Sequence, residues 1–403
     1  MLIVQKYGGT SVGDPERIMN VARRVLRTKQ AGHDVVVVLS AMAGETNRLV
    51  ALAKQMTPEP SGREMDQLLA TGEQVTVALL SLALQQLGQA SRSYLGSQVK
   101  IMTDNAHTKA RIQSIDASNI FKAIKDGEVV VIAGFQGITE EGNITTLGRG
   151  GSDTTAVAIA AAMKADLCEI YTDVDGVYTA DPRIAPSARK LERVSYEEML
   201  ELASLGAKVL QIRSVEFAAK YKVNLVVRSS FNDEEGTLVT DEDKSMEHII
   251  VSGVAVDESE AKLSIRDLPD KPGISMQIFG PIAEAGVNVD MIIQNTGADG
   301  FADLSFTVPS EDLAKSENII LSLKSQLGFS RIDTDCAVAK VSIVGIGMRS
   351  HAGVAARAFK LLADNNINID MISTSEIKIS VIVKKDNGKL AVKVLHDGFG
   401  LGG

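Results

Sequence analysis

The first residues that could bind an anion follow the first apolar run of the chain. Lys6 comes shortly after Leu2–Val4, and Gly8 and Gly9 follow it directly. Glycines between a strand and a helix let backbone N–H groups approach an anion closely, and a lysine adds a full positive charge. A tight turn beside a solvated lysine is the simpler alternative, so this segment on its own only suggests an anion site.

A second glycine-rich segment predicts anion binding more strongly. Arg149 lies among the glycines of segment 148–151, and Ser152 and Asp153 follow at the start of an alanine-rich helical segment. Such a loop forms a concave nest of N–H groups, and a guanidinium binds carboxylate or phosphate through two hydrogen bonds. Helix capping would explain Ser152 or Asp153, but it leaves the glycines around Arg149 unexplained.

A third segment, Thr172–Arg183, combines an aromatic ring, an arginine and several carboxylates. These groups suit the base, phosphates and metal of a nucleotide, although a structural turn remains an alternative. The Asp-x-Asp-Gly core resembles a calcium loop. We exclude a calcium loop because Tyr171 stands at its first ligand position and Pro182 replaces the bidentate glutamate.

Several common cofactor signatures are absent from the sequence. No Gly-x-x-x-x-Gly-Lys-Ser/Thr segment occurs. A dinucleotide fingerprint begins at Gly345, but Ser350 replaces its third glycine, so we interpret that loop as structural. The two cysteines, Cys168 and Cys336, lie far apart, and the five histidines show no metal-ligand spacing. A disulfide framework and a cysteine-rich zinc site are therefore excluded.

The composition predicts a soluble protein of more than one domain. The chain has 403 residues, of which 45% are hydrophobic and 23% charged, and domains average roughly 150 residues. A net charge of −9 disfavours nucleic-acid binding through overall positive charge. No signal peptide precedes the first apolar run, and no apolar stretch approaches the ~18 residues of a membrane span. We predict a cytoplasmic protein that binds neither nucleic acid nor a membrane.

The segments that must position these residues alternate in type over residues 1–231. Val35–Leu39 and Val129–Ala133 are apolar runs without polar alternation, as in strands buried on both faces of a parallel sheet. Asp14 is placed to cap a helix that begins at Pro15. The alternation of strands and helices predicts a layered α/β domain.

An internal repeat follows the acidic, polar segment 232–247, which we interpret as a linker. The stretch Gly273–Asn295 recurs from Gly353, 80 residues later. The matching pairs are Gly273 and Gly353, Phe279 and Phe359, Asn288 and Asn368, Asp290 and Asp370, and Met291 and Met371. Each copy has a predicted strand, loop, helix and strand, so we expect two copies of a small α+β module.

Taken together, these segments resemble the aspartate kinases of the amino-acid kinase family over essentially the whole chain. The resemblance rests on Lys6–Val12, Thr71–Glu73, Gly148–Asp153, Thr172–Tyr178 with Asp181–Arg183, and a repeat similar to paired ACT modules. It implies a three-layer αβα kinase domain with a mostly parallel sheet over residues 1–231 and a linker over 232–247. It further implies tandem α+β, ferredoxin-like ACT modules over 248–335 and 336–403.

The activity that the resemblance implies is ATP-dependent phosphorylation of the side-chain carboxylate of L-aspartate. The product, 4-phospho-L-aspartate, is the first intermediate toward lysine, threonine and methionine. A carboxyl group with a pKa near ~4 is already ionised at neutral pH, so this nucleophile needs no general base. The difficulty is to bring two anions together, so cations and positioning must carry the catalysis.

The resemblance also implies roles for individual residues. Lys6 and Asp153 are the implied catalytic pair, with Lys6 on the transferring phosphoryl group and Asp153 orienting Lys6 or the pocket rather than accepting a proton. The implied aspartate pocket comprises Ser40, Thr46, Glu73, Phe135, Arg149, Gly150, Gly151 and Ser152. The implied nucleotide site comprises Lys6, Tyr7, Gly8, Gly9, Thr172, Asp173, Tyr178, Asp181, Arg183 and Lys208. Mg²⁺ would bridge the phosphates of ATP without a protein ligand set of its own.

Within the pocket, Arg149 would bind the substrate carboxylates and Glu73 the α-ammonium group. Simpler alternatives remain for single residues: Phe135 as plain core, Ser40 as a strand-end turn and Lys208 as an exposed helix lysine.

ACT modules, by the same resemblance, pair side by side and bind amino acids, here lysine, threonine or both. The implied effector-binding residues are Asp270, Asn288, Val289, Asp290, Gln294, Val354, Ala355, Asn368, Ile369, Ser375 and Glu376. The alternative is that the Asn and Asp residues merely begin a strand. We expect an oligomer through ACT pairing, either of identical chains or an α₂β₂ assembly whose regulatory subunit starts at Met246.

Two other functions are alternatives. One is a different amino-acid kinase, such as one that acts on glutamate, against which Glu73 and the Lys6–Gly9 opening argue. The other is a non-catalytic amino-acid sensor, against which the presence of Lys6, Arg149 and Asp153 argues.

Overall fold

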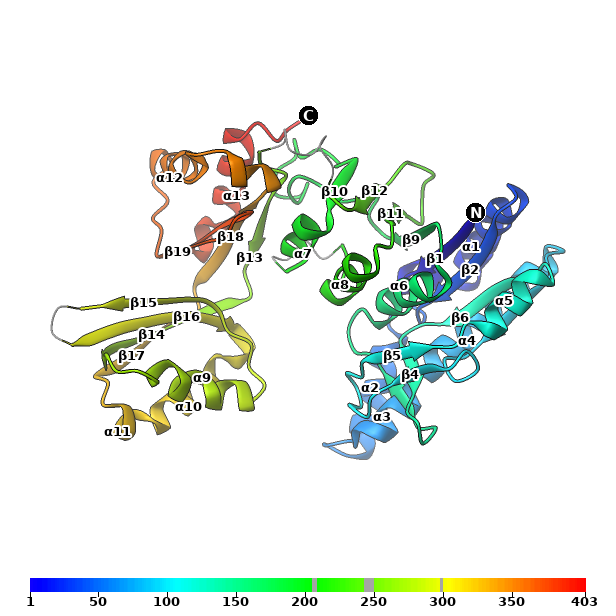
Figure 1. The fold of residues 1–403 in the computed structure, drawn as a ribbon, viewed down its shortest axis with the longest axis horizontal. Helices are drawn as coiled ribbons and strands as arrows, with labels where there is room; N and C mark the ends of the chain where they lie inside the picture. Colours follow the sequence, from blue (N-terminus) through cyan, green and yellow to red (C-terminus); the bar gives the residue numbers. More distant parts are fainter. Residues whose placement is uncertain (205–208, 243–249, 298–299) are drawn as a thin grey trace. The chain divides into compact units, whose positions relative to one another are not determined.

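The computed structural model describes residues 1–204, 209–242, 250–297 and 300–403 (Figure 1). They form two compact units. The first unit contains residues 1–177, 190–203 and the described residues from 209 to 242. The second unit contains Tyr178–Arg189, Ser204 and the described residues from 250 onward.

The first unit is built on an eight-stranded sheet of order β10-β12-β11-β9-β1-β2-β6-β3. Its strands are β1 (Leu2–Tyr7), β2 (Asp34–Leu39), β3 (Ser91–Tyr94), β6 (Val129–Ala133), β9 (Leu167–Thr172), β10 (Arg193–Ser195), β11 (Leu225–Ser229) and β12 (Thr237–Thr240). β11 and β12 pair antiparallel, and the other neighbouring strands pair parallel. The predicted α/β fold with a mostly parallel sheet is therefore confirmed.

Helices cover both faces of this sheet. Contacts with its strands are made by α1 (Pro15–Gln30), α4 (Thr71–Gln86), α5 (Ser118–Lys125) and α6 (Gly151–Met163). The other helices of this part of the chain are α2 (Glu45–Met56), α3 (Gly62–Leu69), α7 (Tyr196–Ser204) and α8 (Ile212–Tyr221). Alternate residues of β2, such as Val35 and Val37, pack with α1 and α4 in one core cluster. β2 is buried throughout from Val35 to Leu39, which explains its unbroken valine run.

Two local expectations about helices can be compared with the structure. Asp14 accepts a hydrogen bond from the Arg17 N–H at 2.8 Å and caps α1, as predicted. The stretch Gly62–Gln86 is helical and apolar enough to cross a membrane by length and composition alone. However, 56% of its apolar window is buried inside the structure, as in the core helix of a globular domain.

A small second sheet was not predicted from the sequence. Its strands are β4 (Ile101–Thr103), β5 (Ile112–Ile115), β7 (Gln136–Ile138) and β8 (Ile144–Thr146), in the order β5-β4-β7-β8. These strands have three or four residues each, too short to produce a clear alternation.

The interpretation of 232–247 as a linker is wrong for Thr237–Thr240, which form β12 between β10 and β11. Thr237 Oγ1 donates to the Leu191 carbonyl at 2.6 Å, and Val239 is fully buried. Acidic neighbours hid this short strand in the sequence. Met246 and the predicted boundary at residue 247 lie outside the described residues.

The second unit contains two four-stranded sheets. One has the order β15-β16-β14-β17, with β14 (Glu260–Pro269), α9 (Ile274–Glu284), β15 (Asp290–Thr296), β16 (Phe301–Pro309), α10 (Leu313–Ser322), α11 (Lys324–Leu327) and β17 (Arg331–Asp335). The other has the order β13-β18-β20-β19, with β13 (Gly253–Asp257), β18 (Val338–Val344), α12 (Val354–Asp364), β19 (Met371–Thr374), β20 (Lys378–Lys384) and α13 (Gly388–Gly398).

The two modules are nested rather than tandem, which corrects the predicted boundaries of 248–335 and 336–403. Strand β13 pairs antiparallel with β18, so the second module begins before the first and encloses it in sequence. Tyr178–Arg189, expected within the kinase domain, also belongs to this unit. The Val254 N–H donates to the Thr179 carbonyl at 2.8 Å, and Ala180 and Ala185 join the core of the second module.

Residues of the internal repeat hold the two modules against each other. Met291 and Met371 meet in one cluster with Val338 and Ile382. Lys340 of β18 pairs with Asp290 of the first module at 2.6 Å. Because these contacts cross between the modules, the repeated positions stabilise their packing.

The ion pairs at this contact are reciprocal. Lys340 also pairs with Glu260 at 3.2 Å, and Lys262 of β14 pairs with Asp370 of the second module at 3.2 Å. Burial disfavours the ionised form of Asp290, but the hydrogen bond and charge of Lys340 outweigh it and hold the pKa of this carboxyl below its usual value.

Lys340→Ala is expected to lower the free energy of unfolding by about 2–4 kcal/mol, because it leaves Glu260 and Asp290 without their cation in a partly buried site. Chemical denaturation measures this change. The control is Lys360→Ala, which removes an exposed pair with Asp364 in α12 and should cost below about 0.5 kcal/mol. Equal losses in the two variants would contradict a stabilising role for the contact between the modules.

Candidate active site

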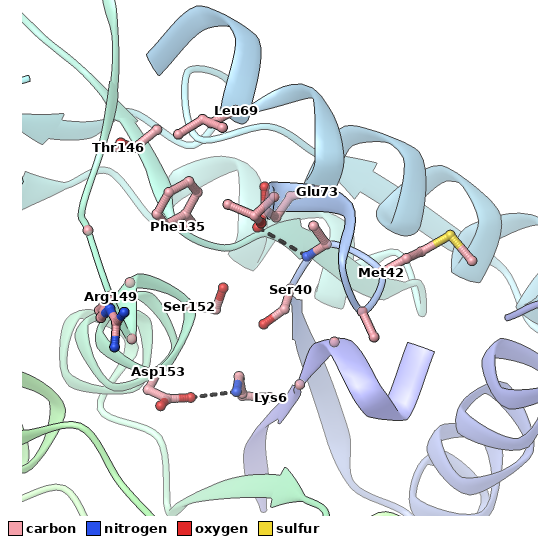
Figure 2. Close-up of a pocket in the computed structure, with 18 of the residues that line it drawn as sticks. Lys6, Ser40, Met42, Leu69, Glu73, Phe135, Thr146, Arg149, Ser152 and Asp153 are labelled. Atoms are coloured by element: carbon pink, nitrogen blue, oxygen red, sulfur yellow. Dashed lines mark hydrogen bonds and ion pairs between the residues drawn. The ribbon is translucent and has the colours of Figure 1, made fainter. Parts of the chain in front are cut away.

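A cavity of about 600 Å³ lies at the carboxyl ends of β1, β2 and β6 and at the start of α6 (Figure 2). The carboxyl ends of parallel strands meet at one edge of a sheet, where ligands of such folds bind. The predicted residues that line this cavity are Lys6, Gly8, Gly9, Ser40, Thr46, Glu73, Phe135, Arg149, Gly150, Gly151, Ser152 and Asp153. Segments far apart in the sequence thus form one site.

A buried ion pair forms one side of this cavity. Lys6 Nζ lies 2.6 Å from Asp153 Oδ1, and the two side chains are only 10% and 11% exposed. Lys6 is the penultimate residue of β1, and Asp153 lies in the first turn of α6, where the helix dipole favours a carboxylate. The pair fixes a positive charge at the cavity.

The glycines after β1 serve close packing between loops. A Cβ on Gly9 would lie 2.8 Å from the Ala41 carbonyl oxygen, so only glycine lets this loop approach the loop after β2. The Gly8 N–H donates to the Tyr171 carbonyl at 3.2 Å. This bond engages the Gly8 N–H in the structure, and the predicted role of Gly8 in nucleotide binding stays a prediction.

The loop that carries Arg149 also requires its glycines. Gly148 and Gly150 have φ values of 76° and 68°, in the region that favours glycine. A Cβ on Gly150 would lie 1.9 Å from Gln211 Cγ, and a Cβ on Gly151 would lie 2.8 Å from Phe135 Cδ2. The Arg149 side chain is exposed and forms no ion pair with the described residues. Its guanidinium can therefore bind an anionic ligand.

Glu73 supplies a buried acid on the opposite side of the cavity from Lys6, with Ser40 and Ser152 between them (Figure 2). The Ala41 N–H donates to Glu73 Oε1 at 3.0 Å, whereas Oε2 has no hydrogen-bond partner among the described residues. Burial raises the pKa of Glu73 to about 8, and the hydrogen bond from Ala41 opposes this shift. An unpartnered buried acid of this kind suits an ammonium ligand.

Phe135 is a cavity wall rather than plain core. Its φ of 67° is rare for a bulky residue, and such backbone strain concentrates at functional sites. The Phe135 N–H donates a hydrogen bond to the Thr155 hydroxyl at 3.1 Å, and the Phe135 carbonyl accepts one from the Leu147 N–H at 2.9 Å. These bonds hold the ring against Gly151.

Several lining residues were not predicted from the sequence: Ala41, Met42, Ala43, Gly44, Leu69, Thr108 and Thr146. The loop Ala41–Gly44 directly follows the buried run of β2. Its place at the same sheet edge as Lys6 could have been found from the parallel strands. Thr108 and Thr146 lie in irregular or short elements that carry no comparable signal.

The residues predicted to bind the nucleotide are divided between the units. Thr172 is the last residue of β9, the neighbour of β1 in the first unit, and Asp173 follows it, whereas Tyr178, Asp181 and Arg183 belong to the second unit. In the second unit, Arg183 Nη2 donates to Asp181 at 2.7 Å, and this hydrogen bond lowers the pKa of Asp181.

Tyr7 and Lys208 are the other two residues predicted to bind the nucleotide. The Tyr7 side chain is fully buried and stacks on Tyr171 with ring centroids 4.6 Å apart, so only its main chain could face a ligand. Lys208 lies outside the described residues. Over the described ranges, no group of three or more His, Cys, Asp or Glu side chains could hold a metal ion.

The residues predicted to bind effectors lie in the second unit, but some of their polar groups are already paired. Asp290 and Asp370 form ion pairs with Lys340 and Lys262, so their carboxylates are already engaged. Glu376 pairs with Arg349 at 3.3 Å.

Other predicted effector residues also have local partners. Gln294 Oε1 accepts from the Ser275 hydroxyl at 3.3 Å, and the Asp270 N–H donates to the Gly300 carbonyl at 2.9 Å. The Ser375 N–H donates to the Lys378 carbonyl at 2.8 Å. Val354 lines a second cavity of about 450 Å³. The predicted effector role of the whole set, including Asn288, Val289, Ala355, Asn368 and Ile369, stays a prediction.

Comparison with known proteins gives consistent results for both units. The model of the amino acid kinase family matches residues 1–229, and ACT domain models match residues 263–328 and 341–399. An aspartokinase of Pseudomonas aeruginosa is 58% identical over 402 residues, which cover 99% of this chain and 98% of that protein.

Solved structures of related proteins match over nearly the full length. The crystal structure of E. coli aspartokinase III in complex with aspartate and ADP aligns with a TM-score of 0.83 at 25% identity, covering 99% of each chain. The same protein in complex with lysine and aspartate aligns with a TM-score of 0.79, at the same identity and coverage.

Glu73→Gln tests the buried acid. Between pH 5 and pH 8 the unfolded chain has an ionised Glu73 while the folded chain keeps the proton, so wild-type stability falls as pH rises. The glutamine variant lacks this loss and should gain about 2–4 kcal/mol in unfolding free energy relative to wild type over that interval. Denaturation at each pH measures the difference.

The matched control for this experiment is Glu64→Gln in α3, where the glutamate side chain is 65% exposed. It should follow the wild-type pH dependence. If Glu73→Gln also runs parallel to wild type from pH 5 to pH 8, the raised pKa of Glu73 is refuted.

Proposed function

The chain belongs to the aspartate kinases of the amino acid kinase family, and we propose that it transfers a phosphoryl group from ATP to the side-chain carboxylate of L-aspartate. The product is 4-phospho-L-aspartate, the first intermediate toward lysine, threonine and methionine. The observation that carries this proposal is the charge pattern of one cavity, which holds Lys6, Arg149 and the unpartnered acid Glu73.

This pattern matches the charges of L-aspartate, which has two carboxylates and one ammonium group at neutral pH. Glu73 would bind the ammonium group, and Arg149 would bind carboxylate through its planar guanidinium fork. Ser40 and Ser152, between Glu73 and Lys6, would donate hydroxyl hydrogen bonds to the substrate (Figure 2). The reacting carboxylate would then face Lys6.

The chain's own contribution to phosphoryl transfer is electrostatic. The nucleophile is already ionised, so no residue needs to remove its proton. Asp153 is engaged by Lys6 at 2.6 Å, which supports a role in orienting the ammonium group rather than in accepting a proton. Lys6, whose side chain is nearly buried, then stabilises negative charge on the transferring group.

The family to which the chain belongs uses a nucleotide, and we propose which residues of this chain bind it and how Mg²⁺ is held. Thr172 at the end of β9, beside β1, and Asp173 directly after it would contact ATP from the first unit. Mg²⁺ would be held chiefly through phosphate oxygens of the nucleotide, and it would neutralise their charge during transfer.

Regulation by lysine, threonine or both is proposed for the ACT modules. The lysine complex of E. coli aspartokinase III supports this proposal. Since Asp290 and Asp370 are paired, recognition of an amino acid would depend more on the amides of Asn288 and Asn368 and on main-chain groups.

We also propose an oligomer formed through these modules, because β15 and β19 expose Ile292 and Ile372 at sheet edges.

Hydroxamate trapping of the acyl phosphate, with aspartate and ATP, tests the function. Lys6→Ala should lose on the order of 10²–10³ in turnover, because it removes a preorganised charge. Lys100→Ala, which removes a 64% exposed lysine, serves as the control and should retain activity. Trapped product with glutamate in place of aspartate would indicate a different amino-acid kinase. ATP binding without any trapped product would indicate a sensor.

The same assay tests regulation. Lysine and threonine at millimolar concentration, singly and together, should inhibit the wild-type protein through a coupling of about 1–3 kcal/mol. Activity that is indifferent to both amino acids in every combination would contradict the regulatory proposal.

A further inference from the structure

Asp66 is a fully buried carboxylate next to the cavity but outside its lining. It lies in α3, and its oxygens accept hydrogen bonds from three donors on segments that follow much later in the chain. The donors are His107 Nδ1 at 2.7 Å, the Thr108 N–H at 3.0 and 3.1 Å, and the Thr146 hydroxyl at 2.5 Å. A buried charge is stable only when paired or well hydrogen-bonded, and Asp66 is bonded on both oxygens.

Two of these donors belong to residues of the cavity wall. Thr108 and Thr146 both line the cavity, and the Ala110 N–H donates to the Thr146 carbonyl at 2.9 Å, which joins their segments. Thr146 lies three residues before Arg149. A Cβ on Gly148 would lie 3.1 Å from the Thr108 carbonyl oxygen, so the loop that carries Arg149 rests on Thr108.

The backbone of Thr108 is held in an unfavourable conformation. Its φ is 69°, which a β-branched residue rarely adopts. Such strain persists only where surrounding contacts enforce it. The hydrogen bond from the Thr108 N–H to Asp66 is one such contact.

A second, partly buried contact restrains the same two segments from another element. Arg213 of α8 donates to the Leu147 carbonyl at 2.6 Å and to the Ala110 carbonyl at 2.9 Å. The wall beside Arg149 is thus held by a carboxylate from α3 and a guanidinium from α8. This double restraint exceeds what a surface turn needs.

We propose that Asp66 is a positioning residue for the aspartate subsite: through Thr108 and Thr146 it fixes the loop that presents Arg149. This inference rests on the proposed function. It concerns binding of the amino acid, because Asp66 bonds to Thr108 and Thr146 beside the Arg149 loop and, among the described residues, forms no hydrogen bond or ion pair with Lys6 or Asp153.

Asp66→Asn keeps the shape of the side chain but replaces one acceptor oxygen with a donor NH₂ group. The amide cannot accept from His107 and Thr146 on separate oxygens as the carboxylate does. The KM for aspartate should rise about tenfold or more, since small misplacement of a binding group has large effects. The KM for ATP should change less than about threefold. Arg149→Ala should shift the two constants in the same selective way.

A double-mutant cycle separates positioning from general destabilisation. Thr146→Val removes the hydroxyl that Asp66 accepts. If Asp66 acts through Thr146, the double variant Asp66→Asn/Thr146→Val should raise the KM for aspartate less than the product of the two single effects. Thr146→Val alone still tests the contact if Asp66→Asn does not fold. Asp116→Asn, at a 43% exposed aspartate before α5, is the matched control and should behave as wild type.

The outcomes distinguish this inference from the proposed function. If wild type yields no trapped acyl phosphate from aspartate, the proposed function fails. If wild type is active but Asp66→Asn leaves the KM for aspartate unchanged, or raises both Michaelis constants equally, the positioning role is refuted. Fully multiplicative effects in the cycle would likewise exclude action through Thr146.

Discussion

Two anionic reactants must meet in a protein whose own net charge is −9, and the buried ion pair of Lys6 and Asp153 addresses this constraint. The pair keeps an ammonium group nearly out of water, where its charge acts at short range with little screening. Glu73 provides the complementary acid across the cavity. We propose that the charged groups of this cavity are spatially separated. Its cations face carboxylate and phosphoryl groups, and Glu73 faces an ammonium group.

The strand order and the glycine-containing loops of the first unit place these charged groups around the cavity. β1 lies between β2 and β9, so Lys6 reaches the sheet edge where α6 begins and Asp153 can pair with it. Gly9 and Gly151 permit the close approach of the loops that enclose the cavity. Asp66 adds a polar contact behind the wall.

Much of this arrangement could be predicted from local sequence. The valine run of β2 indicated a strand buried on both faces, and glycines around Lys6 and Arg149 indicated anion binding at strand ends. What could not be predicted depends on pairing between distant segments. Thr237–Thr240 looks polar in isolation and becomes a strand only between β10 and β11. The nesting of the modules depends on β13 pairing with β18 across an entire inserted module. Asp66 looks like an ordinary helix residue until its partners are brought to it.

The separation of charges in the cavity is tested most directly by calorimetry. The heat of L-aspartate binding is measured near pH 7 in buffers of different ionisation enthalpy. Glu73 has a pKa of about 8 in the free protein and is mostly protonated there. An ammonium group beside it favours the ionised form, so binding of L-aspartate should release a proton to the buffer. Succinate, which has both carboxylates but no ammonium group, should bind without this release. Equal proton release with both ligands, or none with either, would contradict the account.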